Sequence, residues 1–175
     1  MTVSLTRLRA QGFAFAALVF VVDQSVKWLM SGPLHLQRIG SIDLLPFFAL
    51  RWTENYGVSL GMFTATSAEM RLALIGVTGL IALGVAIWML REKAKGDVLA
   101  LALVLGGALG NIWDRMTFGF VIDYADLHIG EWRPFLIFNI ADAAITAGVL
   151  ILLARSLLSR EKPANNGDNT ATETN

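Results

Sequence analysis

Polar residues interrupt the apolar stretches of this sequence in small sets with helical spacing: Asp23 with Lys27, Asn111 with Asp114 and Arg115, and Asn139 with Asp142. Residues three or four apart lie on one face of a helix, so each set would present its polar groups together. Carboxyl and amide groups gathered in this way suit acid–base hydrolysis or the relay of protons. The residues alone leave both kinds of chemistry open.

Structural ion pairs are the simpler interpretation of the charged neighbours. Asp23 with Lys27, and Asp114 with Arg115, could neutralise one another and fix the ends of helices. Asp142 differs, because no cation lies close to it in the sequence. An unpaired carboxyl inside an apolar stretch is a candidate functional group.

The composition argues against several other kinds of site. The chain has no Cys, which excludes thiolate zinc sites, iron–sulfur clusters and Cys nucleophiles. His35 and His128 stand outside any zinc-binding motif, and Ser25 and Lys27 are too close in sequence to share a helix face. Fourteen Lys and Arg balance fourteen Asp and Glu, so no basic excess favours nucleic acid. We therefore expect no metal, no cofactor and no nucleic-acid partner.

The hydrophobicity of the chain points to a membrane. Of the 175 residues, 55% are hydrophobic and 16% are charged, and the mean hydropathy is +0.58. A hydrocarbon core of about 30 Å needs about 20 apolar helical residues, and four stretches approach that length. The sequence predicts an all-α membrane protein with one integral-membrane domain over residues 1–160. Its four transmembrane helices are expected at about 12–30, 70–90, 97–114 and 135–155.

The first apolar stretch has a second interpretation. Arg7 and Arg9 precede it, so residues 1–30 could form a cleaved secretory signal. A cleaved signal ends in small residues, whereas this stretch continues from Asp23 to Trp28 with polar and bulky side chains. That continuation favours a retained helix.

Basic residues predict the orientation of the helices. They occur before the first span, between the second and third, and after the fourth, at Arg7, Arg9, Arg91, Lys93, Lys95, Arg155, Arg160 and Lys162. Because short cytoplasmic segments are enriched in Lys and Arg, we expect both termini in the cytoplasm. Residues 34–63, which contain Pro46, would form a small β-rich segment on the outer side, between helices one and two. The polar residues 161–175 are predicted to be a disordered cytoplasmic tail.

This orientation brings the polar sets to one depth. Spans one and three run outward and span four runs inward, so all three sets lie toward the outer leaflet. A charge that faces lipid costs at least about 2.5 kcal/mol, so the polar faces should turn toward one another. Asp142 would lie roughly 7 residues into the fourth span, on the order of 10 Å from its start. Ala102, Gly106 and Gly110 form a small-residue stripe that lets another helix approach closely.

Three blocks of sequence carry a resemblance to a known family: GGALGNIWDR at 106–115, VIDY at 121–124 and FNIAD at 138–142, with further matches in VDQ at 22–24 and NYGVS at 55–59. Together they resemble the bacterial prolipoprotein signal peptidases, which are the type II signal peptidases. The resemblance covers most of residues 12–155. Blocks in this order, at matching places relative to four spans, are not expected by chance.

The resemblance implies a set of site residues. Asp123 and Asp142 would be the catalytic pair, whereas the residues themselves did not separate Asp123 from Asp126. Other residues would shape the substrate pocket or support it: Asp23, Lys27, Asn55, Gly107, Asn111, Asp114, Arg115, Asn139 and Ala141.

The resemblance also implies an activity. Members of this family are aspartic endopeptidases of the bacterial inner membrane, with the active site toward the periplasm. They remove the signal peptide from diacylglyceryl-modified prolipoproteins and cleave just before the lipidated Cys, without metal or cofactor. Contact with membrane lipid, inhibition by globomycin-type cyclic peptides and a monomeric enzyme are further expectations. The alternative is a proton-coupled transporter or channel subunit, in which Asp23, Asp114 and Asp142 would pass protons across the bilayer.

Overall fold

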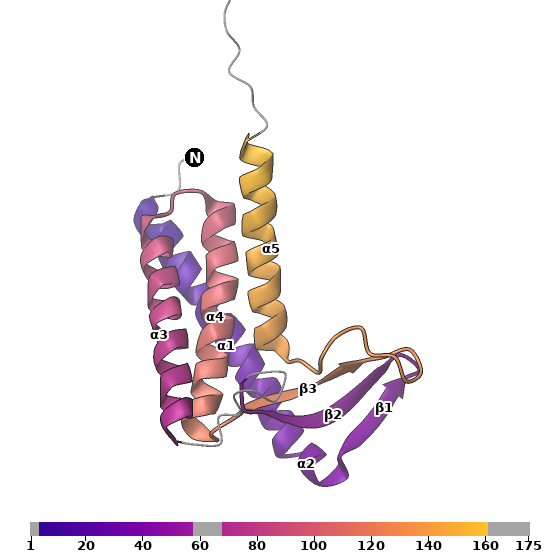
Figure 1. Ribbon diagram of the computed structural model, residues 1–175. Coiled ribbons are helices and arrows are strands. Elements are labelled where there is room, and N and C mark those ends of the chain that lie inside the picture. Colours follow the sequence, from indigo (N-terminus) through magenta and orange to yellow (C-terminus); the bar gives the residue numbers. More distant parts are fainter. Residues whose placement is uncertain (1–3, 58–67, 161–175) are drawn as a thin grey trace, which may run out of the picture.

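The computed structural model describes residues 4–57 and 68–160, which are mostly helical (Figure 1). Within them, four helices are long and apolar enough to cross a membrane: α1 (Leu5–Ser31), α3 (Ala68–Arg91), α4 (Lys95–Thr117) and α5 (Ile140–Arg160). This confirms the prediction of four apolar helices. α1 begins well before residue 12, because a helix can continue beyond its apolar stretch. The predicted tail at 161–175 lies outside the described residues.

A small sheet completes the fold. After α1 comes the short helix α2 (Leu36–Ile39), followed by an antiparallel pair, β1 (Ser41–Leu45) and β2 (Phe48–Asn55). The third strand, β3 (Val121–Leu127), pairs antiparallel with β2. The expected β-rich segment between the first two long helices is therefore only part of the sheet, because β3 comes from between α4 and α5. In Figure 1 the sheet extends from one end of the helices, while α1 begins and α5 ends at the opposite end.

The central helix α4 contacts each of the other three long helices. Small residues make this close packing possible. Gly106 faces Ala16 and Val19 of α1, whereas Gly107 faces the backbone of Ala141 on α5. A Cβ at either glycine would collide with the neighbouring helix. The predicted small-residue stripe is thus confirmed as a packing surface.

α5 begins at Ile140 rather than near residue 135, where the sequence predicted its span to start. The preceding segment is bound to the sheet instead. The backbone N–H groups of Tyr124 and Ala125 donate to the carbonyl of Phe138 (3.1 and 2.8 Å), and the Phe138 N–H donates back to Ala125 (3.2 Å). Pro134 also disfavours helix in the residue before it. Residues 133–138 therefore form a connection that runs beside β3.

Candidate active site

The first turn of α5 carries two of the predicted site residues. Asn139 immediately precedes the helix, and its Oδ1 accepts a hydrogen bond from the backbone N–H of Asp142 (2.8 Å). In return, Asp142 Oδ2 accepts from the backbone N–H of Asn139 (3.2 Å). This reciprocal arrangement is a capping box, which satisfies N–H groups that a helix end leaves free. Asp142 therefore lies in the first turn of α5 and not deeper in a span, which corrects the depth expected from the sequence.

Two asparagines join Asp142 to Asp123. The side-chain amide of Asn139 donates to Asp123 Oδ1 (2.7 Å), and that of Asn111 donates to Asp142 Oδ1 (2.8 Å). The asparagines are themselves linked, because Asn139 Nδ2 lies 3.2 Å from Asn111 Oδ1. On its other side Asp123 accepts from Asn55 Nδ2 (2.9 Å), at the end of β2. Residues from β2, α4, β3 and α5 thus place both carboxyl groups in one cluster.

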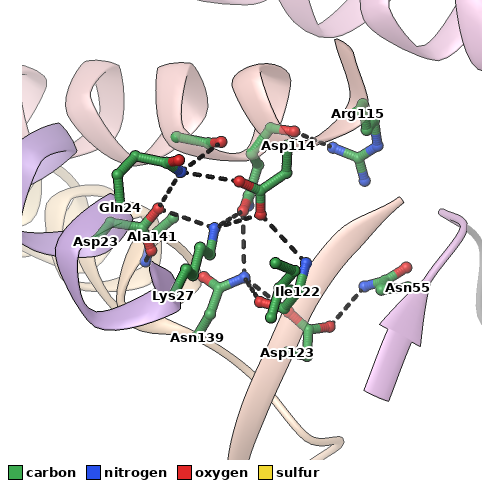
Figure 2. A network of polar contacts seen from close by, with 12 residues as sticks. Asp23, Gln24, Lys27, Asn55, Asp114, Arg115, Ile122, Asp123, Asn139 and Ala141 are labelled. Atoms are coloured by element: carbon green, nitrogen blue, oxygen red, sulfur yellow. Dashed lines mark hydrogen bonds and ion pairs between the residues drawn. The ribbon is translucent and has the colours of Figure 1, made fainter. Parts of the chain in front are cut away.

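A buried network centred on Lys27 supports this cluster (Figure 2). Lys27 Nζ lies 2.8 Å from Asp23 Oδ2 and 2.7 Å from Asp114 Oδ2, and all three side chains are almost fully buried. The ion pair between Asp23 and Lys27 is as expected. Asp114, however, pairs with Lys27 of α1 and not with Arg115, because adjacent residues on a helix do not face each other.

Each supporting carboxylate also binds a backbone N–H group. Asp23 Oδ1 accepts from the N–H of Ala141 (2.9 Å), and Asp114 Oδ2 accepts from the N–H of Ile122 (3.1 Å). Gln24, which the sequence did not single out as a site residue, donates to both carboxylates and to the carbonyl of Gly110. Its position next to Asp23 was the only signal in the sequence, because its other two contacts, with Gly110 and Asp114, are on α4.

The sheet separates Asp123 from Asp126, which the sequence alone could not do. The two are three residues apart on β3 and so face opposite sides of the strand. Asp126 is fully buried and pairs with Arg51 (3.0 Å) and Arg133 (3.1 Å). Asp123 forms no ion pair within the described part of the chain and is bound by amide groups only. Asp126 is thus a structural acid, while Asp123 remains available for chemistry.

The environment of Asp123 favours its protonated form. Burial, and then the negative charge of Asp142, raises the pKa of Asp123 to about 7, despite the hydrogen bonds from Asn55 and Asn139. An aspartate of this kind can hold or release a proton near neutral pH. The pKa of the neighbouring Tyr124 is also raised, mainly by burial, so its hydroxyl stays protonated.

Two adjacent grooves open beside the aspartates. The first, of about 560 Å³, includes Asp123 and runs between the end of β2 and residues 133–137. The second, of about 420 Å³, includes Asp142 and is lined mostly by apolar side chains of the connection and of α5. Phe135 and Leu136 line both grooves. Asp123 and Asp142 therefore line different grooves, and Phe135 and Leu136 form the wall between the two.

Arg115 lies at the edge of this arrangement, as Figure 2 shows. Its Nη1 donates to the carbonyl of Asn111 (3.4 Å), and its Nε is buried without a hydrogen-bond partner among the described residues. The guanidinium also approaches Gly57, where a Cβ would come within 3.3 Å of Nη2. Gly57 has a φ of +78°, which favours glycine in any case. A small residue here leaves space for the arginine.

All of the predicted site residues lie in or beside this assembly. Sequence reasoning missed several side chains of the first groove, chiefly Glu54, Tyr56 and Arg133. Their signal was weak, because polar residues in an outer loop are common. Across residues 4–57 and 68–160, no group of three or more His, Asp and Glu is placed to hold a metal ion.

The sequence matches known proteins over most of its length. Residues 15–158 match the family described as "Signal peptidase (SPase) II". The lipoprotein signal peptidase of Sphingopyxis alaskensis is 58% identical over 151 residues, which cover 86% of this chain and 87% of the relative. That of Rhizorhabdus wittichii is 56% identical over 162 residues, covering 91% and 94%.

A solved structure of a bacterial membrane enzyme has the same fold. It superposes with a TM-score of 0.73 over 94% of this chain and 95% of its own, at 24% identity. This likeness supports the architecture of long apolar helices with a small sheet. The family match over residues 15–158 and the relatives at 58% and 56% identity lead to one conclusion: the chain belongs to the signal peptidase II family of membrane proteases.

Proposed function

We propose that this protein is an aspartic endopeptidase that removes the signal peptide from diacylglyceryl-modified prolipoproteins, with Asp123 and Asp142 as its catalytic pair. One observation carries the assignment of the pair. The side chain of Asn139 donates to Asp123, and its backbone N–H donates to Asp142, so a single residue holds both carboxyl groups beside a groove. Cleavage just before the lipidated Cys would leave that Cys as the new N-terminus.

The two carboxyl groups would act as one unit. Nearby carboxyls cannot both ionise cheaply, so they share a proton and supply an acid and a base at the same pH. The ionised member takes a proton from water, which attacks the peptide carbonyl. The protonated member hydrogen-bonds the carbonyl oxygen, and protons then pass to the departing amine. The raised pKa of Asp123 supports this sharing near neutral pH.

The two grooves suit the two parts of such a substrate. The groove beside Asp123 carries hydrogen-bonding groups, which an extended peptide needs when it leaves water. The groove beside Asp142 is apolar and lies along a membrane-spanning helix, where lipid contact is expected. Asn111, Asn139 and Arg115 would satisfy backbone groups of the peptide, with Asn55, Gly107 and Ala141 completing the pocket. Globomycin-type cyclic peptides would compete for the same groove, and no second subunit is required.

The proposed site faces the periplasm from the bacterial inner membrane. The sheet lies at one end of the long helices, and the loop between α3 and α4 lies at the other (Figure 1). Lys93 of that loop, with Arg91 and Lys95 at the adjoining helix ends, favours the cytoplasm. Both termini would then be cytoplasmic. A reporter fused after Glu131 should read periplasmic and one at Lys93 cytoplasmic; the reverse would overturn this orientation.

Substitution of the pair tests the proposed chemistry. Asp123→Asn and Asp142→Asn should each insert and fold, yet leave a diacylglyceryl-modified precursor at full length on a gel. The matched control is Asp43→Asn, because Asp43 is an exposed acid on β1. Full processing by either site variant would refute the pair. Activity should also survive exhaustive chelation, and a loss that added zinc restores would contradict a metal-free reaction.

The transporter alternative predicts a different outcome. It requires proton flux through liposomes that contain the protein, and no cleavage of precursor. Asp23 and Asp114 both form ion pairs with Lys27, which favours their ionised form and makes them poor proton carriers. Family membership further favours the peptidase.

A further inference from the structure

A third groove lies on the face of α4 opposite the aspartates. It has a volume of about 690 Å³ and is lined by side chains from residues 13–20 of α1, 79–86 of α3 and 105–116 of α4. Leu109 and Ile112 face this groove, whereas Asn111 and Asp114 point from the other side of α4 into the site network. All of its described lining residues are apolar. The proposed reaction makes no use of this space.

Small residues keep the groove open. Elsewhere in the bundle they bring helices into contact, as Gly106 and Gly107 do on α4. Ala17 of α1 and Gly79 of α3 border the groove instead. A Cβ at Gly79 would meet no atom of a neighbouring helix within 4 Å in the part of the chain that is described. Because protein interiors are close-packed, a space of this size between three helices has room for an occupant from outside the chain.

The groove is about one leaflet deep. Its lining on α4 extends over eleven residue steps, from Leu105 to Met116, or about 16 Å at about 1.5 Å per residue. Half of a hydrocarbon core of about 30 Å is about 15 Å. Met116 lies one residue before the end of α4, at the sheet end of the helices (Figure 1). The groove therefore begins near one surface of the bilayer and extends to about its middle.

The inner end of the groove is closed. Met89 of α3 is fully buried there, and a Cβ at Gly12 of α1 would collide with Met89 and with Val98 of α4. The three helices thus meet just beyond the groove. An apolar space that opens at the surface and ends at mid-membrane has the shape that a single hydrocarbon chain needs.

A basic residue lies at the open end. Arg71 is in the first turn of α3 and is exposed. Its Nη1 approaches Gly119, just after α4, where an added Cβ would come within 2.8 Å of it. Arg71 precedes Ala82 by eleven residues, about three turns, so the two lie on the same side of α3. A guanidinium in this place could donate to a phosphate group at the surface.

We propose that this groove binds one acyl chain of a glycerophospholipid from the leaflet on the sheet side, with the lipid phosphate at Arg71. The chain enters beside Met116 and ends near Met89. This lipid is distinct from the substrate, because α4 separates the groove from Asp123 and Asp142. The inference therefore does not depend on the proposed function, and its test requires no cleavage.

The size of the groove argues against a peptide occupant. A transmembrane helix is about 10–12 Å wide, so a length of about 16 Å would occupy about 1,300 Å³. The groove provides about 690 Å³. A signal-peptide helix would therefore have to separate α1 from α3, whereas a single acyl chain is narrow enough to enter without moving them.

Gly79→Leu tests the site, because it places a side chain in the groove where a Cβ meets free space. The probe is dipalmitoyl phosphatidylglycerol, titrated into the full-length protein in detergent, with bound lipid counted by native mass spectrometry. The wild type should bind one lipid tightly. Each excluded methylene weakens binding about fourfold, and Leu should exclude about two, so the Kd of Gly79→Leu should rise about fifteenfold.

Gly84→Leu is the matched control. Gly84 is on the same helix, is exposed and also has free space at its Cβ, but it does not line the groove. Its Kd should equal that of the wild type. Arg71→Gln should raise the Kd up to about fivefold, whereas Arg38→Gln, which removes an exposed arginine from α2, should leave it unchanged. Equal effects of the two arginine variants would overturn the placement of the phosphate.

A second measurement needs no variant. Phosphatidylglycerol with a photoreactive diazirine on its palmitoyl chain should label residues 13–20 and 79–86 of the wild type more strongly than Leu153 and Leu157, which are exposed on α5. Labelling that is equal on these surfaces would show ordinary bilayer lipid and overturn the site. Equal Kd values for Gly79→Leu and Gly84→Leu would do the same. Displacement of the lipid by a diacylglyceryl-modified precursor peptide would show that substrate occupies the groove, and would also overturn the proposal.

Discussion

The pH dependence of cleavage should respond to Asn55 in a direction that the structure fixes. The pair needs one shared proton, and the pKa of Asp123 is raised to about 7, so kcat/KM of the wild type should fall as pH rises through about 7. Asn55 Nδ2 donates to Asp123 Oδ2 over 2.9 Å and so stabilises the ionised carboxylate. Asn55→Ala removes that donor. The pKa should rise, the pair should keep its proton to higher pH, and the alkaline limb should move upward.

The size of the shift follows from the bond that is lost. A hydrogen bond to a charged group contributes about 1.5–3 kcal/mol. One pKa unit corresponds to about 1.36 kcal/mol. The groove beside Asp123 admits water, which would replace part of the lost bond. We therefore expect the limb to move by about one unit, from about pH 7 to about pH 8.

The assay is a profile of kcat/KM against pH, measured with the protein in lipid nanodiscs and a diacylglyceryl-modified precursor peptide that has no ionisable side chain near the cleaved bond. The pH at which kcat/KM falls to half does not depend on the maximum of kcat/KM, so a variant with a reduced rate can still be measured. Asp43→Asn is the control, because it removes an exposed charge from β1 and should leave the limb in place. An unchanged limb for Asn55→Ala, or a limb that moves to lower pH, would refute the assigned role of Asp123.

Further substitutions at three positions test the packing and the network. Lys27→Met leaves two buried carboxylates without their cation and should destabilise the protein by about 3–5 kcal/mol, measured as thermal unfolding in detergent. Gly107→Ala places a methyl group against the carbonyl of Ala141, so displacement of α5 should lower kcat on the order of 100-fold while the protein still inserts. Asn139→Ser keeps a capping oxygen for α5, whereas Asn139→Ala does not. Both variants should abolish cleavage. The free energy of unfolding of Asn139→Ala should be about 1 kcal/mol lower than that of Asn139→Ser, and equal values would contradict the capping role.

The transmembrane helices were predictable because their signal is local. Leu72 to Leu90 contains no charged residue, and a stretch of this length needs no knowledge of its neighbours to be assigned to a membrane. The small-residue stripe on α4 was also readable, since only close helix packing uses such spacing. Which helix each glycine faces came from the structure alone.

The start of α5 was not predictable from hydropathy. Phe135 to Phe138 is as apolar as the helix that follows, so the sequence assigned it to the fourth span. In the structure Phe138 pairs with Ala125 of β3, and Phe135 and Leu136 form the wall between the grooves. Apolar side chains at a membrane surface can line a binding groove as well as a bilayer, and composition does not distinguish the two.

Charge pairing was predictable only where both partners share a helix turn. Asp23 and Lys27 are four residues apart and pair as expected. The partner of Asp114 is on another helix, so the nearest cation in sequence was a poor guide. In the same way, Asp126 is identified as structural by an arginine from β2 and another from the connection before α5.

The Lys27 network explains how two catalytic groups from separate segments can be held together. The residue before Asp123 and the residue before Asp142 each donate their backbone N–H to a supporting carboxylate: Ile122 to Asp114, and Ala141 to Asp23. Lys27 bridges those two carboxylates. A displacement of β3 would therefore strain the same ion pairs that fix α5, so the strand and the helix are positioned through one buried cation. Buried ion pairs of this kind add little stability over apolar packing, but they restrict geometry, and geometry is what a pair of aspartates sharing one proton requires.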